Sequence, residues 1–175
     1  MLCHPGLRLM TVDVARIEDL VRRIARELET TRARIAVAES CTGGWIAKCL
    51  TDRPGSSAWF GYGFVVYSNQ AKCALLGVSE ETLAGQGAVS EDVAEQMATG
   101  ARLISGAEIA VAVTGIAGPG GDTSDKPVGS VCFAWAGPGV QLVSDSRRFE
   151  GDRDSIRCQS VIAALEGVLN QLTAP

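Results

Sequence analysis

The fold is decided by the stretch Ile35-Ala36-Val37-Ala38-Glu39-Ser40-Cys41-Thr42-Gly43-Gly44, in which an apolar run passes directly into small and polar residues. Residues 35–38 have the character of a short buried strand, and residues 45–50 read as a helix. A strand-to-helix turn exposes backbone N–H groups that lack partners within the helix, and the helix dipole favours negative charge there. Such a turn is suited to hold a phosphate or to stabilise an oxyanion.

A second turn of the same kind follows the apolar run 109–113, and it reads Thr114-Gly115-Ile116-Ala117-Gly118-Pro119-Gly120-Gly121-Asp122. If the two strands are neighbours in one parallel sheet, both loops lie at the edge where open α/β sheets bind ligands. The alternative is that the glycines only make turns, because glycine adopts backbone angles that other residues avoid.

The composition indicates one globular domain with a substantial core, since 46% of the 175 residues are hydrophobic. The net charge of −4, with arginines interleaved among acidic residues near the N-terminus, argues against a nucleic-acid partner. No segment is long and apolar enough to cross a membrane or to act as a signal peptide, which predicts a cytoplasmic protein. The six cysteines are scattered without a C-x-x-C pair, so neither a metal site nor a disulfide framework is expected.

The periodicity predicts a loose segment over residues 1–11 and a single domain over 12–175. Within the domain, a first amphipathic helix reaches about Thr30, and Asn69 is expected to cap a later helix. Strands are expected at 60–67, 130–136 and 141–149, with Pro138-Gly139 as a hairpin turn and a final helix from about Asp152. Helices and strands alternate before the hairpin closes the sheet. The prediction is an α/β fold, a three-layer α/β/α domain with a mixed, mainly parallel sheet.

The only histidine is His4, in the segment expected to be loose, so a Ser-His-Asp triad is close to excluded. If Ser40 is a nucleophile, a lysine with a lowered pKa is the usual substitute base. The chain has three lysines. Lys48 is expected at the surface, whereas Lys72 and Lys126 lie at loop junctions, and Tyr67 is a candidate to relay the proton or to orient Lys72.

Several blocks of the sequence closely resemble the signature blocks of the CinA C-terminal domain family, in the same order. These are residues 38–44, 66–72 (Val-Tyr-Ser-Asn-Gln-Ala-Lys), 87–90 (Gly-Ala-Val-Ser), 113–121, 126–129 (Lys-Pro-Val-Gly) and 149–153 (Phe-Glu-Gly-Asp-Arg). The resemblance spans about Ile35 to the C-terminus. It covers this one type of domain, so no function of the additional N-terminal domain of longer family members is expected from it.

The resemblance implies a homo-oligomeric enzyme that needs neither metal nor cofactor and hydrolyses nicotinamide mononucleotide to nicotinate mononucleotide and ammonia in pyridine-nucleotide salvage. It implies that Ser40 is catalytic, with Tyr67 and Lys72 as partners. Backbone N–H groups near Thr42, Gly43 and Gly44 are then candidate oxyanion donors. The remaining candidate substrate-binding residues are Glu39, Asn69, Thr114, Gly115, Gly118, Gly120, Lys126 and Arg153, with Lys126 or Arg153 placed to neutralise the phosphate.

Three alternatives stay open at this point. The first is a non-catalytic nucleotide-binding module in which Ser40 is only a hydrogen-bonding hydroxyl. The second makes Cys41 the nucleophile, because a thiolate is intrinsically reactive and a helix N-terminus lowers its pKa. The third places the nucleophile at Ser68, four residues before Lys72. Trp59 and Phe60 are candidates for an interface between subunits or, equally, for the core.

Overall fold

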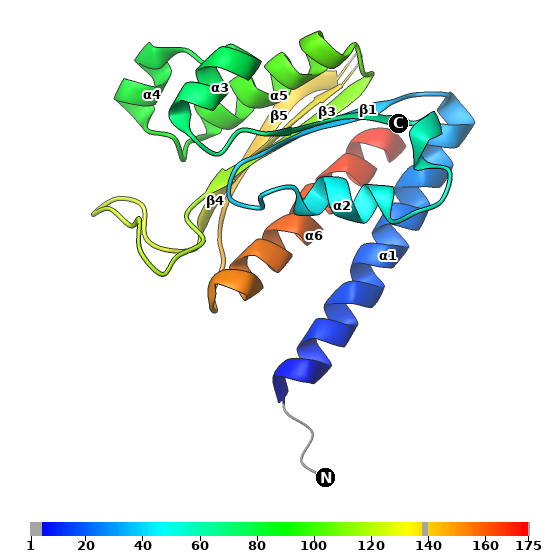
Figure 1. Cartoon of the computed structure of the whole chain (residues 1–175), viewed down its shortest axis with the longest axis horizontal. Helices are drawn as coiled ribbons and strands as arrows, with labels where there is room; N and C mark the ends of the chain where they lie inside the picture. Colours follow the sequence, from blue (N-terminus) through cyan, green and yellow to red (C-terminus); the bar gives the residue numbers. More distant parts are fainter. Residues whose placement is uncertain (1–4, 138–139, 175) are drawn as a thin grey trace.

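The computed structural model, drawn in Figure 1, describes residues 5–137 and 140–174. Their strands form one sheet in the order β2-β1-β3-β4-β5. The strands are β1 (Ile35–Glu39), β2 (Phe60–Val65), β3 (Ile109–Gly115), β4 (Ser130–Gly137) and β5 (Val140–Arg148). Strand β1 pairs in parallel with both β2 and β3, while β4 is antiparallel to β3 and β5 is antiparallel to β4. Every strand except β4 therefore points the same way, which confirms the predicted mixed, mainly parallel sheet.

Helices cover both faces of the sheet and complete the predicted three layers (Figure 1). On one face lie α1 (Pro5–Thr31), α2 (Trp45–Thr51) and α6 (Arg153–Thr173). The other face carries α3 (Asn69–Leu76), α4 (Glu80–Gln86) and α5 (Glu91–Ser105). A single turn of 3-10 helix, η1 (Ser56–Ala58), precedes β2.

The two faces have different cores because side chains alternate along each strand. In β1, Ile35 and Val37 pack with the α1, α2 and α6 side, whereas Ala36 and Ala38 pack with the α5 side. The α5 side is rich in alanine from both the sheet and the helix, which lets α5 lie close to the strands. The same alternation carries Ser40, the residue after β1, toward the α3 and α5 side.

The boundaries of two helices differ from the prediction. Helix α1 begins at Pro5, so it includes residues 5–11 that were expected to be loose. Proline suits the first helical position, because its missing N–H would have no partner there and its φ is already helical. Helix α3 is capped by Ser68, whose Oγ accepts the N–H of Ala71 at 3.1 Å, and Asn69 is its first residue. His4 and the Pro138-Gly139 turn lie outside the described residues.

Trp59 belongs to the core, with 1% of its surface exposed, so its side chain is unavailable for an interface between subunits. Phe60 is half-buried and packs against the same core. Within the described ranges, no helix combines the length and the apolar character that crossing a membrane requires.

Candidate active site

Ser40 lies at the end of β1, where two neighbouring strands meet the two glycine-rich loops. Strands β1 and β3 pair in register, with Glu39 opposite Val113, and the N–H of Ser40 continues the ladder by donating to the carbonyl of Val113 at 3.0 Å. Both glycine-rich loops therefore begin at one edge of the sheet, as the sequence predicts. This is the edge at which α/β sheets bind ligands.

Lys72 reaches Ser40 from helix α3. Its Nζ lies 3.1 Å from Ser40 Oγ and also donates to two backbone carbonyls, those of Val66 at 3.1 Å and Tyr67 at 3.3 Å. The residue is 1% exposed, and burial lowers the pKa of its ammonium group. None of these three acceptors is a carboxylate, and burial outweighs the smaller opposing effects of Cys41 and Cys73. The pair has the geometry and the electrostatics of a nucleophile with an amine base.

Glu39 holds the turn after β1 and is not placed to bind a substrate. Its carboxylate is fully buried and accepts three backbone N–H groups, from Gly44 at 3.1 Å, Ile46 at 3.1 Å and Ala47 at 2.9 Å. It thus satisfies the free donors at the start of α2 and complements the helix dipole. The expectation that Glu39 contacts the substrate is corrected, because the helix occupies both carboxylate oxygens.

Two of the three predicted oxyanion donors are also engaged within the protein. The N–H of Gly43 donates to the carbonyl of Ser40 at 3.1 Å, and that of Gly44 donates to Glu39. Among the described residues, no backbone carbonyl or side-chain oxygen accepts the N–H of Cys41 or Thr42. The N–H groups of the turn without an oxygen partner are therefore those of Cys41, which contacts its own sulfur, and of Thr42, which is fully buried.

The two other candidate nucleophiles are poorly placed. Burial raises the pKa of the Cys41 thiol to about 12, and only 5% of the residue is exposed, so the thiolate is not formed near neutral pH. The hydroxyl of Ser68 caps helix α3, and Lys72 Nζ is bonded to Ser40 Oγ instead. The environment therefore favours Ser40 over both.

A cavity of about 180 Å³ opens over the Ser40–Lys72 pair. The sequence-predicted residues that line it are Ser40, Tyr67, Asn69, Lys72, Thr114, Gly115 and Arg153. Arg153, the first residue of α6, donates to the carbonyl of Gly118 at 2.6 Å and to the hydroxyl of Tyr67 at 3.2 Å. Arg153 thereby links the second glycine loop to Tyr67, which is 60% exposed. Thr114 is buried and donates through its hydroxyl to Ala88.

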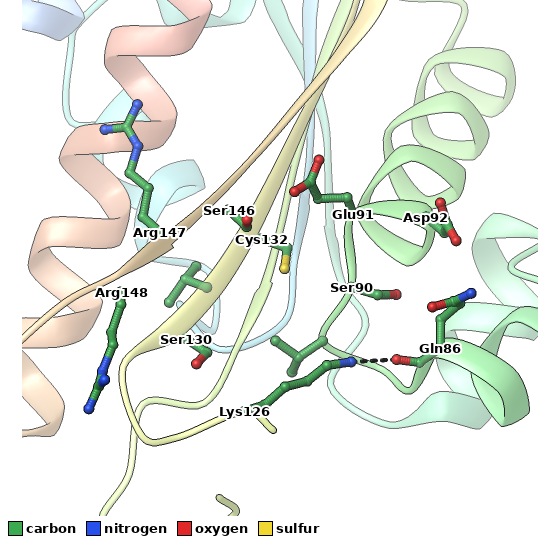
Figure 2. A pocket seen from close by; sticks show the side chains of 12 residues that line it. Gln86, Ser90, Glu91, Asp92, Lys126, Ser130, Cys132, Ser146, Arg147 and Arg148 are labelled. Atoms are coloured by element: carbon green, nitrogen blue, oxygen red, sulfur yellow. Dashed lines mark hydrogen bonds between the residues drawn. The ribbon is translucent and has the colours of Figure 1, made fainter. Parts of the chain in front are cut away.

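Lys126 lines a neighbouring pocket, drawn in Figure 2, and not the cavity above Ser40. Its Nζ donates to the carbonyl of Gln86 at 2.5 Å, and Glu91 and Arg148 line the same space of about 500 Å³. Val89 lines both pockets, so they are adjacent. Gly120 is exposed and lines neither of them. Among the described residues, no three His, Cys, Asp or Glu side chains gather where they could hold a metal ion.

Arg157 is a site residue that the sequence reasoning missed. From helix α6 it donates to the carbonyl of Cys41 at 3.2 Å and to that of Thr42 at 3.0 Å. Its guanidinium lies over the ring of Trp45, with 5.3 Å between the guanidinium carbon and the ring centroid. The acceptors are main-chain carbonyls that lie 116 and 115 residues away in the sequence, so no side-chain motif could have pointed to this contact.

Comparisons with known proteins agree with this architecture. The model of the CinA C-terminal domain matches residues 17–172, almost the whole domain. The chain belongs to the CinA C-terminal domain family. That assignment confirms the resemblance drawn from the sequence blocks around Ser40, Lys72 and the second glycine loop.

The similar proteins include named relatives and solved structures. The chain is 50% identical over 153 residues to the nicotinamide-nucleotide amidohydrolase PncC of Pseudomonas putida, a match that covers 87% of this chain and 95% of that protein. It is 48% identical over 152 residues to the protein of the same name from Escherichia coli K12, covering 87% and 92% of the two chains. The crystal structure of the competence/damage inducible protein CihA from Agrobacterium tumefaciens superposes with a TM-score of 0.86 at 45% identity. That match covers 98% of this chain and 100% of the other.

Proposed function

We propose that this chain hydrolyses the carboxamide of nicotinamide mononucleotide to nicotinate mononucleotide and ammonia. The observation that carries the proposal is the contact of 3.1 Å between Lys72 Nζ and Ser40 Oγ beneath an open cavity. The substrate comes from the names of the relatives, which are nicotinamide-nucleotide amidohydrolases of nearly the same length.

The contacts of Lys72 suit a neutral amine that acts as a general base. A neutral amine has two N–H bonds and one lone pair, and a carbonyl oxygen can only accept. The carbonyls of Val66 and Tyr67 take the two N–H bonds, so the lone pair is left for the hydroxyl proton of Ser40. The hydroxyl of Tyr67 is bonded to Arg153, which favours direct proton transfer from Ser40 to Lys72 over a relay through the phenol.

The reaction then proceeds in two steps, the formation of an ester on Ser40 and the hydrolysis of that ester. Ser40 Oγ attacks the carboxamide carbon while its proton passes to Lys72 Nζ. That proton moves to the amide nitrogen as the C–N bond breaks, and ammonia leaves behind an ester on Ser40. A water molecule attacks the ester, gives its proton to Lys72 Nζ and releases nicotinate mononucleotide. The proton finally returns to Ser40 Oγ.

The oxyanion of both tetrahedral intermediates is stabilised by the N–H of Cys41, which lines the cavity, whereas Thr42 is fully buried and does not line it. The residue after the nucleophile supplies such a donor in other serine hydrolases that use a strand-turn-helix elbow. One donor of this kind is worth on the order of 10²- to 10³-fold in rate. This assignment replaces Gly43 and Gly44, whose N–H groups are occupied.

Residues at the mouth of the cavity would bind the rest of the substrate. Tyr67 offers an exposed ring against which the pyridine ring can stack, and Asn69 and Thr114 supply polar groups nearby. Arg153 brings a positive charge to the same wall, which suits the phosphate. A role for Lys126 requires the substrate to extend past Val89 into the neighbouring pocket.

The first experiment measures ammonia and nicotinate mononucleotide formed from nicotinamide mononucleotide by the chelator-treated protein, its Ser40→Ala variant and its Ser68→Ala variant. We expect turnover by the unmodified protein and by Ser68→Ala, and none by a folded Ser40→Ala. Binding of the mononucleotide without release of ammonia would instead support the nucleotide-binding module. A homo-oligomeric state, a cytoplasmic location and a place in nucleotide salvage stay predictions.

A further inference from the structure

The turn that carries Ser40 is held from both faces of the sheet, and only one of the two supports belongs to the proposed chemistry. Lys72 approaches from α3 on one side. Arg157 approaches from α6 on the other side and bonds two consecutive carbonyls, those of Cys41 and Thr42. A planar guanidinium can hold two carbonyls at once in a fixed geometry, which an ammonium group cannot do.

The orientation of these carbonyls determines the orientation of the free N–H groups. A trans peptide places its C=O and N–H on opposite sides, so the Cys41 carbonyl held by Arg157 turns the N–H of Thr42 away from α6. The carbonyl of Ser40 is likewise fixed by the N–H of Gly43, which turns the N–H of Cys41 out of the turn. The Thr42 carbonyl accepts from both Arg157 and the N–H of Trp45. Arg157 thus fixes two of the three peptide planes between Ser40 and Gly43.

The side chain of Arg157 is itself well supported. Its guanidinium packs over Trp45, the first residue of α2, and pairs with Asp154 at 3.4 Å. Its side chain is 26% exposed, whereas that of Asp154 is 79% exposed. The Asp154 pair lies in solvent and is worth little, so the two carbonyls and the Trp45 ring define the position of the guanidinium.

We infer that Arg157 is a positioning residue that steadies the turn and so aims the N–H of Cys41 at the oxyanion, a role that rests on the proposed amide hydrolysis. It holds the carbonyl of Thr42, which lies in the same peptide as the Gly43 N–H, and that N–H fixes the Ser40 carbonyl and with it the N–H of Cys41. Arg157 does not touch the cavity above Ser40. It acts through the backbone of the turn. Without it, the Cys41 carbonyl loses its partner and the Thr42 carbonyl keeps only the N–H of Trp45, so the turn is held less firmly and the site is less preorganised for the reaction.

A groove on the far side of the turn makes the inference testable by chemical rescue. Arg157 lines a cavity of about 950 Å³ between α1, α2 and α6, together with Trp45, Cys49 and Cys158. A small guanidinium ion can therefore reach the place of the missing side chain without passing through the active site. The ring of Trp45 remains there to bind it.

The test compares Arg157→Ala, Arg157→Lys and Arg157→Met with Asp154→Ala, which removes only the exposed partner. For nicotinamide mononucleotide, we expect Arg157→Ala to lower kcat about 10²-fold with KM nearly unchanged, since the lost interaction acts only in the transition state. Arg157→Lys should keep most of the defect, and millimolar ethylguanidinium should restore activity to Arg157→Ala. Asp154→Ala should behave as the unmodified protein. Arg157→Met keeps the apolar stem over Trp45 and serves if Arg157→Ala does not fold.

An unchanged kcat in Arg157→Ala, while the unmodified protein is active, would overturn this inference and leave the proposed function intact. A loss of kcat that follows a lower melting temperature and is not rescued would also overturn it, because Arg157 would then serve folding alone. Amide hydrogen exchange at Gly43 and Trp45 provides a readout that needs no substrate. Faster exchange there in Arg157→Ala, but not in Asp154→Ala, is expected even if the mononucleotide is not turned over, and unchanged exchange would reject the inference.

Discussion

Lys72 shows how one buried side chain can be prepared for chemistry without a charged neighbour. Desolvation disfavours its ammonium form, and its three contacts are a hydroxyl and two carbonyls. A carboxylate in the same place would pair with the ammonium and keep it protonated. The absence of such a partner among these contacts is therefore as important to the proposed base as the contact with Ser40.

At the residue scale, this electrostatic setting predicts the pH dependence of turnover. Only neutral Lys72 accepts a proton, so kcat/KM should rise with pH along a limb whose apparent pKa lies below the 10.5 of an ordinary lysine. Lys72→Arg should be inactive at every pH, because arginine stays charged. The check is a pH–rate profile for nicotinamide mononucleotide. A limb at or above 10.5, or an active Lys72→Arg, would exclude Lys72 as the base.

The sequence could predict the residues whose roles depend on local pattern. Ser40 stands at a strand-to-helix turn, and the lack of a histidine beyond His4 points to a lysine base. The family resemblance then implies that this lysine is Lys72. It could not predict which backbone N–H groups are free, since that depends on Glu39 folding back onto α2. Nor could it place Lys126, whose loop extends into a separate pocket.

The elements were predictable to the extent that their signals are local. Strands β1 and β3 follow from apolar runs, whereas their pairing is shown only by the structure. Once they are neighbours, the rule that parallel strands bring their loops to one edge places both glycine loops together. The sequence predicts the start of α1 too late, because the amphipathic pattern becomes clear only from Val14. The sequence predicts Asn69 as the cap of α3, whereas Ser68 provides it, since both residue types favour that position.

At the element scale, the approach of α3 to α5 should control the position of Lys72. Gly100 in α5 faces the end of α3 so closely that an added Cβ would lie 2.0 Å from the carbonyl oxygen of Leu76. Gly100→Ala must therefore push α3 away, although alanine is normally the better helix former. We expect a loss of about 1–3 kcal/mol in unfolding free energy from overpacking. A fall in kcat of up to about 10²-fold should accompany it as Lys72 shifts from Ser40.

The matched control is Gly85→Ala in the neighbouring helix α4, where an added Cβ meets nothing within 4 Å. This variant should keep kcat and be equally or slightly more stable. Chemical unfolding and steady-state kinetics measure both effects. Equal kcat in Gly100→Ala and Gly85→Ala would show that the helix packing does not set the geometry of Lys72.

At the scale of the whole molecule, the layered fold buries several titratable groups whose effects on stability have opposite signs. Burial raises the pKa of Cys41 to about 12 and the pKa values of Cys49 and Cys132 to about 11, against 9.0 for an unperturbed thiol. Above about pH 9 the thiols of the unfolded chain lose protons that the same thiols keep in the folded chain. These thiols therefore lower the free energy of unfolding as pH rises. Lys72 acts in reverse: its pKa is lowered on folding, so the unfolded chain binds more protons up to pH 10.5 and stability rises with pH.

The net expectation is a protein that loses stability above about pH 9, less steeply than its thiols alone would dictate. Denaturant unfolding under reducing conditions from pH 7 to 10.5 tests this with two variants. Cys132→Ala should flatten the decline, because one raised thiol pKa is removed. Lys72→Met should steepen it, because the opposing group is gone while the thiols remain. If Lys72→Met left the slope unchanged, the lysine would titrate alike in the folded and unfolded chains, and the neutral base on which the proposed hydrolysis depends would lose its physical support.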